Sequence, residues 1–248
     1  MHVTTVPPRR AGREQAFNLT ELAVVLALLV LLICMTLPAL AAGRDRSRVV
    51  QCAANLRQIS LALHIYGNEY GDKMPPNGPG VWIWDLAWSA GSFIERTGCK
   101  WTAMYCPGTN VRFTGQDNLA LYNFNPGAFH VIGYAVTLPG TASLNSTNQN
   151  TSLTPQSVTS ATPPPPAAQR VFLADATISA SGQNNEAARY TYNYTNITGG
   201  YPKSHLSAHL NGNIPAGGNL AMLDGHVEWR KFPEMHVRTI GSSPVFWW

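Results

Sequence analysis

The chain has 248 residues, enough for one domain with attached segments or for two small domains. Charged residues make up only 12% of it, about half the usual share, and Asn, Thr, Ser, Pro and Gly are abundant in their place. The formal charge is +4, and Arg9, Arg10 and Arg13 lie together near the N-terminus. This composition favours an exported, loop-rich protein over a cytosolic enzyme. Because no concentrated basic face is present, it also argues against nucleic acid as a partner.

The N-terminal region consists of a basic leader, residues 1–16, followed by an apolar stretch. Residues 22–42 carry no charge, and as a helix they would measure about 30 Å, the thickness of a bilayer core. We therefore predict a membrane-spanning helix over residues 17–42. A plain signal anchor and a secretory signal peptide both compete with a processed leader, since Ala39-Leu40-Ala41 fits the small-x-small cleavage rule.

The helical pattern continues beyond residue 42. Apolar side chains recur at alternating steps of three and four, which places them on one stripe of a helix; they are Val49, Cys52, Leu56, Ile59, Leu63 and Tyr66. Gly67 and Gly71 then provide stop signals. Residues 43–70 are therefore predicted to form an amphipathic continuation of the same helix, with Pro38 bending it where a hydrogen bond is lost.

Residues 71–248 are predicted to form a globular, β-rich head. Short apolar segments alternate there with Gly, Pro and Asn turns, and Asp224-Gly225 favours a two-residue hairpin tip. Residues 137–168 are rich in Ser, Thr, Asn and Pro, so we expect a mobile polar excursion that buries little apolar surface. The fold class expected is α+β, with a long N-terminal helix packed on a small antiparallel sheet.

Cysteine spacing leaves several possibilities open. Cys34 lies in the apolar stretch, and any two of Cys52, Cys99 and Cys106 could form a disulfide whose pairing the spacing does not decide. The spacing from Cys99 to Cys106 is looser than zinc-binding cysteine pairs require, so no metal site is predicted. No cofactor is expected, although a structural calcium in the head remains an alternative.

The N-terminal region resembles a type IV prepilin. Phe17 would be the first mature residue, with Thr20 after it, Glu21 at mature position five and Pro38 at the position of a helix-kinking proline. The resemblance implies that a prepilin peptidase cleaves between Ala16 and Phe17 and that the new terminus of Phe17 is N-methylated. The family has Gly where this chain has Ala16. A carboxylate at the edge of an apolar span needs a partner, and the resemblance supplies one for Glu21, the amino terminus of a neighbouring subunit.

Later segments resemble the same family, which is related to the type II secretion pseudopilins. Cys52-Ala53-Ala54-Asn55-Leu56-Arg57-Gln58-Ile59 is similar to its Cys-x-x-Asn-Leu-Arg/Lys-Gln-Ile run, and the Asn219 to Val227 segment to its terminal Asp-Gly-His-Val motif. The family places a His nine residues before that Asp. In this chain fourteen residues separate His209 from Asp224.

The resemblance implies a non-enzymatic structural subunit of a type II secretion or type IV pilus-like filament. Its partners would be the prepilin peptidase, other pilin-like subunits and an inner-membrane assembly platform. It would be a single-pass protein of the bacterial inner membrane with its head in the periplasm. The alternative is an exported or membrane-anchored module that binds a glycan or another ligand, with Trp82 and Trp84 as candidate contacts for a glycan. A hydrolase ranks last, because the sequence shows no nucleophile–base pair and no paired carboxylates.

Overall fold

A computed structural model describes residues 18–109, 111–156, 163–240 and 244–248, without the side chains of residues 36–42. The chain divides into two compact units, Met1–Arg44 and Asp45–Trp248. The second unit contains the sheets and the hydrophobic core, and we call it the head. The leader, Ala16 and Phe17 lie outside the described residues.

The chain forms three α-helices and ten short strands within the described residues. The α-helices are α1 (Leu19–Glu69), α2 (Trp88–Arg96) and α3 (Gly115–Tyr122). The strands are β1 (Asp85–Ala87), β2 (Phe129–Val131), β3 (Tyr134–Val136), β4 (Val171–Asp175), β5 (Ile178–Ser179), β6 (Leu210–Asn211), β7 (Ile214–Pro215), β8 (Gly217–Met222), β9 (Val227–Lys231) and β10 (Val245–Phe246). Six 3-10 turns lie between them: η1 (Trp101–Met104), η2 (Pro107–Thr109), η3 (Ser146–Asn148), η4 (Ala167–Gln169), η5 (Glu186–Thr191) and η6 (Phe232–Glu234).

An antiparallel sheet of strand order β3-β4-β8-β9 forms the centre of the head. Its two middle strands are buried almost throughout, which fits their small and apolar residues. The other three sheets are two-stranded, β1-β2, β5-β10 and β6-β7. These findings confirm an α+β head with small antiparallel sheets.

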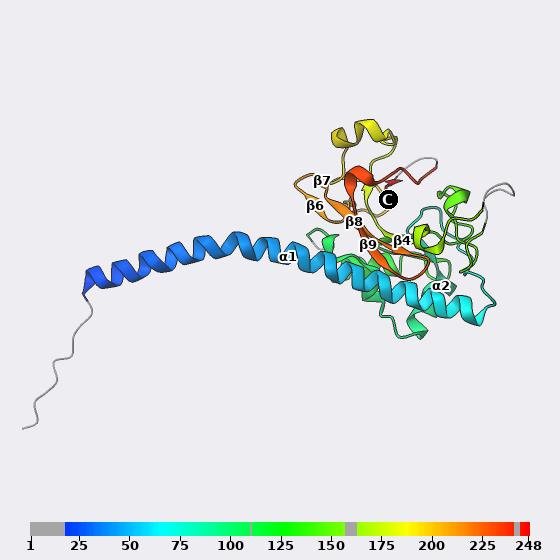
Figure 1. Cartoon of the computed structure of the whole chain (residues 1–248), viewed down its shortest axis with the longest axis horizontal. Helices are drawn as coiled ribbons and strands as arrows, with labels where there is room; N and C mark the ends of the chain where they lie inside the picture. The colour runs from blue at the N-terminus through cyan, green and yellow to red at the C-terminus, as the bar shows by residue number, and fades with distance from the viewer. Residues whose placement is uncertain (1–17, 110, 157–162, 241–243) are drawn as a thin grey trace, which may run out of the picture. The chain divides into compact units, whose positions relative to one another are not determined.

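The helix α1 runs without interruption from Leu19 to Glu69, and its C-terminal half lies along the central sheet (Figure 1). The predicted stripe is confirmed, since Cys52, Leu56, Ile59 and Leu63 are all at most 1% exposed. Two hydrogen bonds attach this face to β8 and the turn after it. The Asn219 side chain donates to the Val49 carbonyl at 3.0 Å, and His64 Nε2 lies 2.9 Å from the Leu223 carbonyl.

The N-terminal part of α1 does not confirm the predicted membrane span over residues 17–42. Among the residues that the structure describes, no helix combines the length and the apolar character needed to cross a membrane. Pro38 falls within α1, but its side chain is among those not described.

The polar segment after β3 differs from its prediction as a mobile excursion. Residues 137–156 are part of the packed head, with Leu138 and Leu144 at most 1% exposed, whereas their composition predicts a mobile excursion. Polar side chains hold the segment in place. Arg170 donates to the Asn150 side chain at 2.9 Å and to the Thr147 and Gln149 carbonyls at 3.0 and 2.7 Å. Composition alone does not predict that this segment is ordered, because side chains rather than a regular sheet satisfy backbone carbonyls such as those of Thr147 and Gln149.

The turn between β8 and β9 is one residue longer than predicted. The Gly225 amide donates to the Met222 carbonyl at 2.9 Å, and only Gly225 of the two tip residues has a positive φ, of 90°. This arrangement is a turn over Leu223 and Asp224 followed by a left-handed glycine, the usual three-residue hairpin.

Asp85 makes the stability of the head pH-dependent. Its Oδ2 accepts the Val81 and Trp82 amides, both at 2.9 Å, while its buried Oδ1 has no partner among the described residues. Burial raises the pKa of Asp85 to about 6, against the lowering effect of those two amides.

We predict that the free energy of unfolding contributed by Asp85 falls by about 3 kcal/mol as pH rises from below 4 to above 6. In that window the folded head retains a proton that the unfolded chain has lost. Burial lowers the pKa of His205 to about 4, so His205 contributes a slope of the opposite sign in the same window to wild type and variant alike. Urea titrations should therefore show the Asp85 contribution as the difference between the wild-type and Asp85→Asn profiles, whereas the exposed Asp45→Asn should keep the wild-type profile. Parallel profiles for wild type and Asp85→Asn would contradict the assignment.

Candidate functional site

Four polar side chains meet inside the head, and each comes from a different segment. Cys52 comes from α1, Cys106 from the residue before η2, Asp175 from the end of β4, and His209 from the residue before β6. Their sulfur, oxygen and nitrogen atoms all lie within 4.8 Å of one another. We call these four residues the buried tetrad. Cys52, Cys106 and Asp175 are at most 1% exposed and His209 is 9% exposed.

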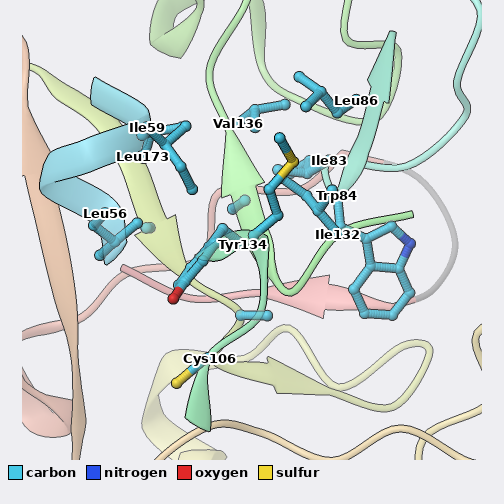
Figure 2. Packing of buried hydrophobic residues seen from close by; sticks show 14 of the residues in the cluster. Leu56, Ile59, Ile83, Trp84, Leu86, Cys106, Ile132, Tyr134, Val136 and Leu173 are labelled. Carbon is cyan, nitrogen blue, oxygen red and sulfur yellow. The ribbon is translucent and has the colours of Figure 1, made fainter. Parts of the chain in front are cut away.

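The two cysteines of the tetrad come from different elements, α1 and the segment before η2. Cys52 lies on the buried stripe of α1, and its sulfur is 2.7 Å from Asp175 Oδ1 and 3.6 Å from the Tyr134 hydroxyl. Cys106 precedes a tight turn in which the Gly108 amide donates to its sulfur at 3.3 Å. Cys106 lies at the edge of the aliphatic cluster, below the ring of Tyr134 (Figure 2).

Asp175 is held by the register of the central sheet. It pairs with Tyr134 across β3 and β4, and its Oδ2 accepts the Asn219 amide of β8 at 2.7 Å. The same Oδ2 lies 3.3 Å from His209 Nε2. The carboxylate therefore joins β4, β8 and the His209 segment.

The backbone of His209 adopts an unusual conformation that directs its ring into the tetrad. Its φ is 51°, in the left-handed region where non-glycine residues are uncommon. Its Nε2 lies 3.2 Å from the Cys106 sulfur, and the Trp229 ring packs edge-on at 5.4 Å between centroids. The hairpin β6-β7 begins directly after it and closes where the Ala216 amide donates to the His209 carbonyl at 3.0 Å. The residues that follow His209 are thus a local hairpin, which leaves the histidine beside β8.

The charges of the tetrad are strongly coupled. Burial alone would lower the pKa of His209, but contacts with Asp175 and Cys52 outweigh it and raise that pKa to about 10. Burial would likewise raise the pKa of Asp175, and the hydrogen bond and charge of His209 lower it instead. Burial raises the pKa of the Cys106 thiol well above its ordinary value. At neutral pH, with no ion bound, the tetrad therefore contains an imidazolium–carboxylate pair and a protonated Cys106.

This geometry bears on two chemical roles. Cys106 and His209 are close enough for a nucleophile–base pair, which the sequence did not reveal. However, a reactive cysteine requires an exposed, low-pKa thiolate, and Cys106 is fully buried with a raised pKa. Two sulfurs, an imidazole and a carboxylate converging on one point are instead a set of donors suited to a transition metal.

The other residues singled out by the sequence lie away from the tetrad. Cys99 is buried elsewhere, with its sulfur 3.9 Å from the Lys100 carbonyl, and all four cysteines are free. Cys52 and Cys106 are therefore the two whose side chains meet. Trp84 is 2% exposed and packs on His205 in the core, so it cannot form a surface platform with Trp82.

Glu21 lies in the first turn of α1, where its Oε2 accepts the Asn18 amide at 3.0 Å. The residues around it are large, apolar and exposed. From Leu19 to Met35 the large apolar side chains are between 44% and 81% exposed. They occupy consecutive positions, as in residues 28–33, and therefore cover all faces of the helix.

Sequence reasoning missed the tetrad because its members are separated by 54, 69 and 34 positions along the chain. Metal motifs are recognised by short ligand spacings, and none exists here. Comparison of the chain with protein-family models, curated proteins and solved structures finds no match. Its function therefore has to be inferred from its own residues.

Gly108 is the residue whose substitution tests how closely the tetrad is packed. A Cβ there would lie 2.9 Å from the His209 amide nitrogen and 3.2 Å from the Cys106 sulfur. We expect Gly108→Ala to destabilise the head by about 1–3 kcal/mol, because the contact includes backbone that cannot move freely. Gly115→Ala is the matched control, since a Cβ there meets nothing within 4 Å. Equal urea midpoints for the two variants would show that the tetrad tolerates displacement.

Proposed function

We propose that this chain is a non-enzymatic structural subunit of a type II secretion or type IV pilus-like filament. One observation carries the proposal, the exposed apolar surface on all faces of α1 from Leu19 to Met35. Exposing such an apolar surface to water is energetically unfavourable, and stable soluble monomers rarely do so. Lipid or other apolar helices must therefore cover it. A pilin-like subunit uses both covers in turn, the inner membrane before assembly and neighbouring helices afterwards.

Glu21 gives this surface a specific assembly role. It is a carboxylate in the first turn of an otherwise apolar helical segment. Within a bundle of such helices an unpaired carboxylate is costly, and a neighbour's amino terminus would neutralise it. Cleavage before Phe17 would create that amino terminus, only four residues from Glu21. Pairing between subunits would then fix the axial position of each helix.

The head fits a role as the exposed part of such a subunit. It is a compact unit of its own, and it holds the C-terminal half of α1 through the buried stripe. Force applied to the helix would therefore reach the central sheet directly. In this proposal the subunit is anchored in the bacterial inner membrane with its head in the periplasm, and its partners are the prepilin peptidase, other pilin-like subunits and the assembly platform.

Processing is the first test. Mass spectrometry of the protein isolated from membranes of cells that contain a prepilin peptidase should find N-methylated Phe17 at the N-terminus. The same protein from peptidase-deficient cells should retain residues 1–16. A mature terminus at Ala42, after the Ala39-Leu40-Ala41 pattern, would contradict the proposal and support secretion instead.

Assembly is the second test. Glu21→Gln should reduce the amount of chain recovered in sheared filaments or cross-linked oligomers at least about tenfold, because the neutral amide cannot pair with an amino terminus. The control is Glu69→Gln, at the other end of α1, which should assemble normally. Normal thermal unfolding of the head in both variants would exclude misfolding as the cause. Wild-type assembly of Glu21→Gln would show that the carboxylate has no role in register.

A further inference from the structure

We propose that the buried tetrad binds one thiophilic divalent metal ion of the zinc class, which fastens the C-terminal half of α1 to the central sheet and to the segments around Cys106 and His209. The site lies entirely within the head, so it would form whether or not the chain assembles into filaments. Its four donors are Cys52 Sγ, Cys106 Sγ, Asp175 carboxylate oxygen and His209 Nε2.

The spacing of the donors fits tetrahedral coordination. Bonds of about 2.0–2.3 Å to zinc place neighbouring donor atoms about 3.3–3.8 Å apart. The separations of 3.2 Å between Cys106 and His209 and 3.3 Å between His209 and Asp175 lie close to that range. Cys52 and Asp175 are closer, at 2.7 Å, so binding would move these two side chains apart by roughly an ångström.

The chemistry of the donors determines the class of ion. Thiolate and imidazole ligands select zinc and related transition metals, whereas calcium and magnesium require oxygen. The structural calcium considered from the sequence is therefore not suited to this cluster. Four protein donors fill a tetrahedron and leave no position for water or substrate, which is the arrangement of a structural rather than a catalytic zinc site.

Binding exchanges protons for the ion without any redox change. The two thiols and the imidazolium would release their protons to solvent, and the carboxylate is already ionised. Two thiolates, one carboxylate and a divalent cation leave one net negative charge. The amides of Asn219 and Gly108 already donate to Asp175 and Cys106, so they would stabilise that charge.

The surroundings hold the donors in place. The Asn219 and Gly108 amides orient two of the ligands, and Trp229 packs against the imidazole of the third. The left-handed backbone at His209 is strained for a non-glycine residue, which indicates that its position is imposed by the surroundings.

An entry route is also present. An open cavity of about 640 Å³ reaches the His209 side of the tetrad, and its lining includes Val49, Gly108 and Trp229. An ion could therefore reach His209 without unfolding of the sheet. The ligands it would join are separated by up to 157 positions along the chain. Because they meet only in the folded head, the free energy of binding the ion would add to the free energy of folding.

The test is a Co²⁺ titration of the full-length chain in detergent, reduced and stripped of metal with a chelator. Co²⁺ reports tetrahedral thiolate coordination through its absorption bands. We expect thiolate-to-cobalt charge transfer and tetrahedral ligand-field bands that saturate at one ion per chain and disappear when one equivalent of Zn²⁺ is added. Cys106→Ser removes one of the four proposed ligands and should weaken binding at least about 100-fold, beyond the 10- to 100-fold that loss of an outer-shell partner typically costs. Cys99→Ser, a buried cysteine outside the tetrad, should bind as wild type does.

The wild-type titration decides the proposal even if Cys106→Ser fails to fold. Absence of the charge-transfer bands in the reduced wild-type chain would overturn it. So would equal loss of binding in Cys99→Ser and Cys106→Ser when near-ultraviolet circular dichroism shows both to be folded. A Cys52–Cys106 disulfide in the purified protein, with no metal uptake after reduction, would assign these cysteines to a covalent link instead.

Discussion

A carboxylate placed at the centre of the head, Asp175, is the constraint on which the surrounding structure depends. Burying a charge without partners is strongly unfavourable, so every segment that reaches this point has to supply one. The β8 strand supplies the Asn219 amide, α1 supplies Cys52, and the segment before β6 supplies His209. The positions of the helix, the central sheet and the histidine are therefore linked through a single side chain.

Local sequence patterns predicted the parts of this fold that local physics controls. The stripe through Cys52, Leu56 and Ile59 predicted which face of α1 is buried, because helical spacing depends only on near neighbours. The α+β class followed in the same way from short apolar segments separated by turn residues. The packed segment around Asn150 was not predictable from composition, since its order comes from Arg170, which lies outside the polar run that it holds.

The candidate site was beyond such patterns for a related reason. Each member of the tetrad has an ordinary local setting, such as a cysteine on a helix stripe or an aspartate ending a strand. The four side chains converge on one point only in the folded head. There the sheet register brings Asp175 beside Asn219, and α1 lies against β8. The N-terminal part of α1 and the head thus differ in how their surfaces and buried groups are satisfied. The N-terminal part of α1 exposes apolar surface that other molecules would have to cover, while the head surrounds its buried Asp175 carboxylate with partners from its own segments.

The hairpin β6-β7 has a consequence for how related chains are recognised. Its two ends meet at the hydrogen bond from the Ala216 amide to the His209 carbonyl, so its length does not affect where His209 lies. A shorter or longer hairpin closed by the same hydrogen bond would therefore leave the histidine in its place. A search that fixes the number of residues between the histidine and the Asp-Gly turn would overlook such chains. The position of the histidine beside the start of β8 in the folded structure is a better criterion than its spacing in the sequence.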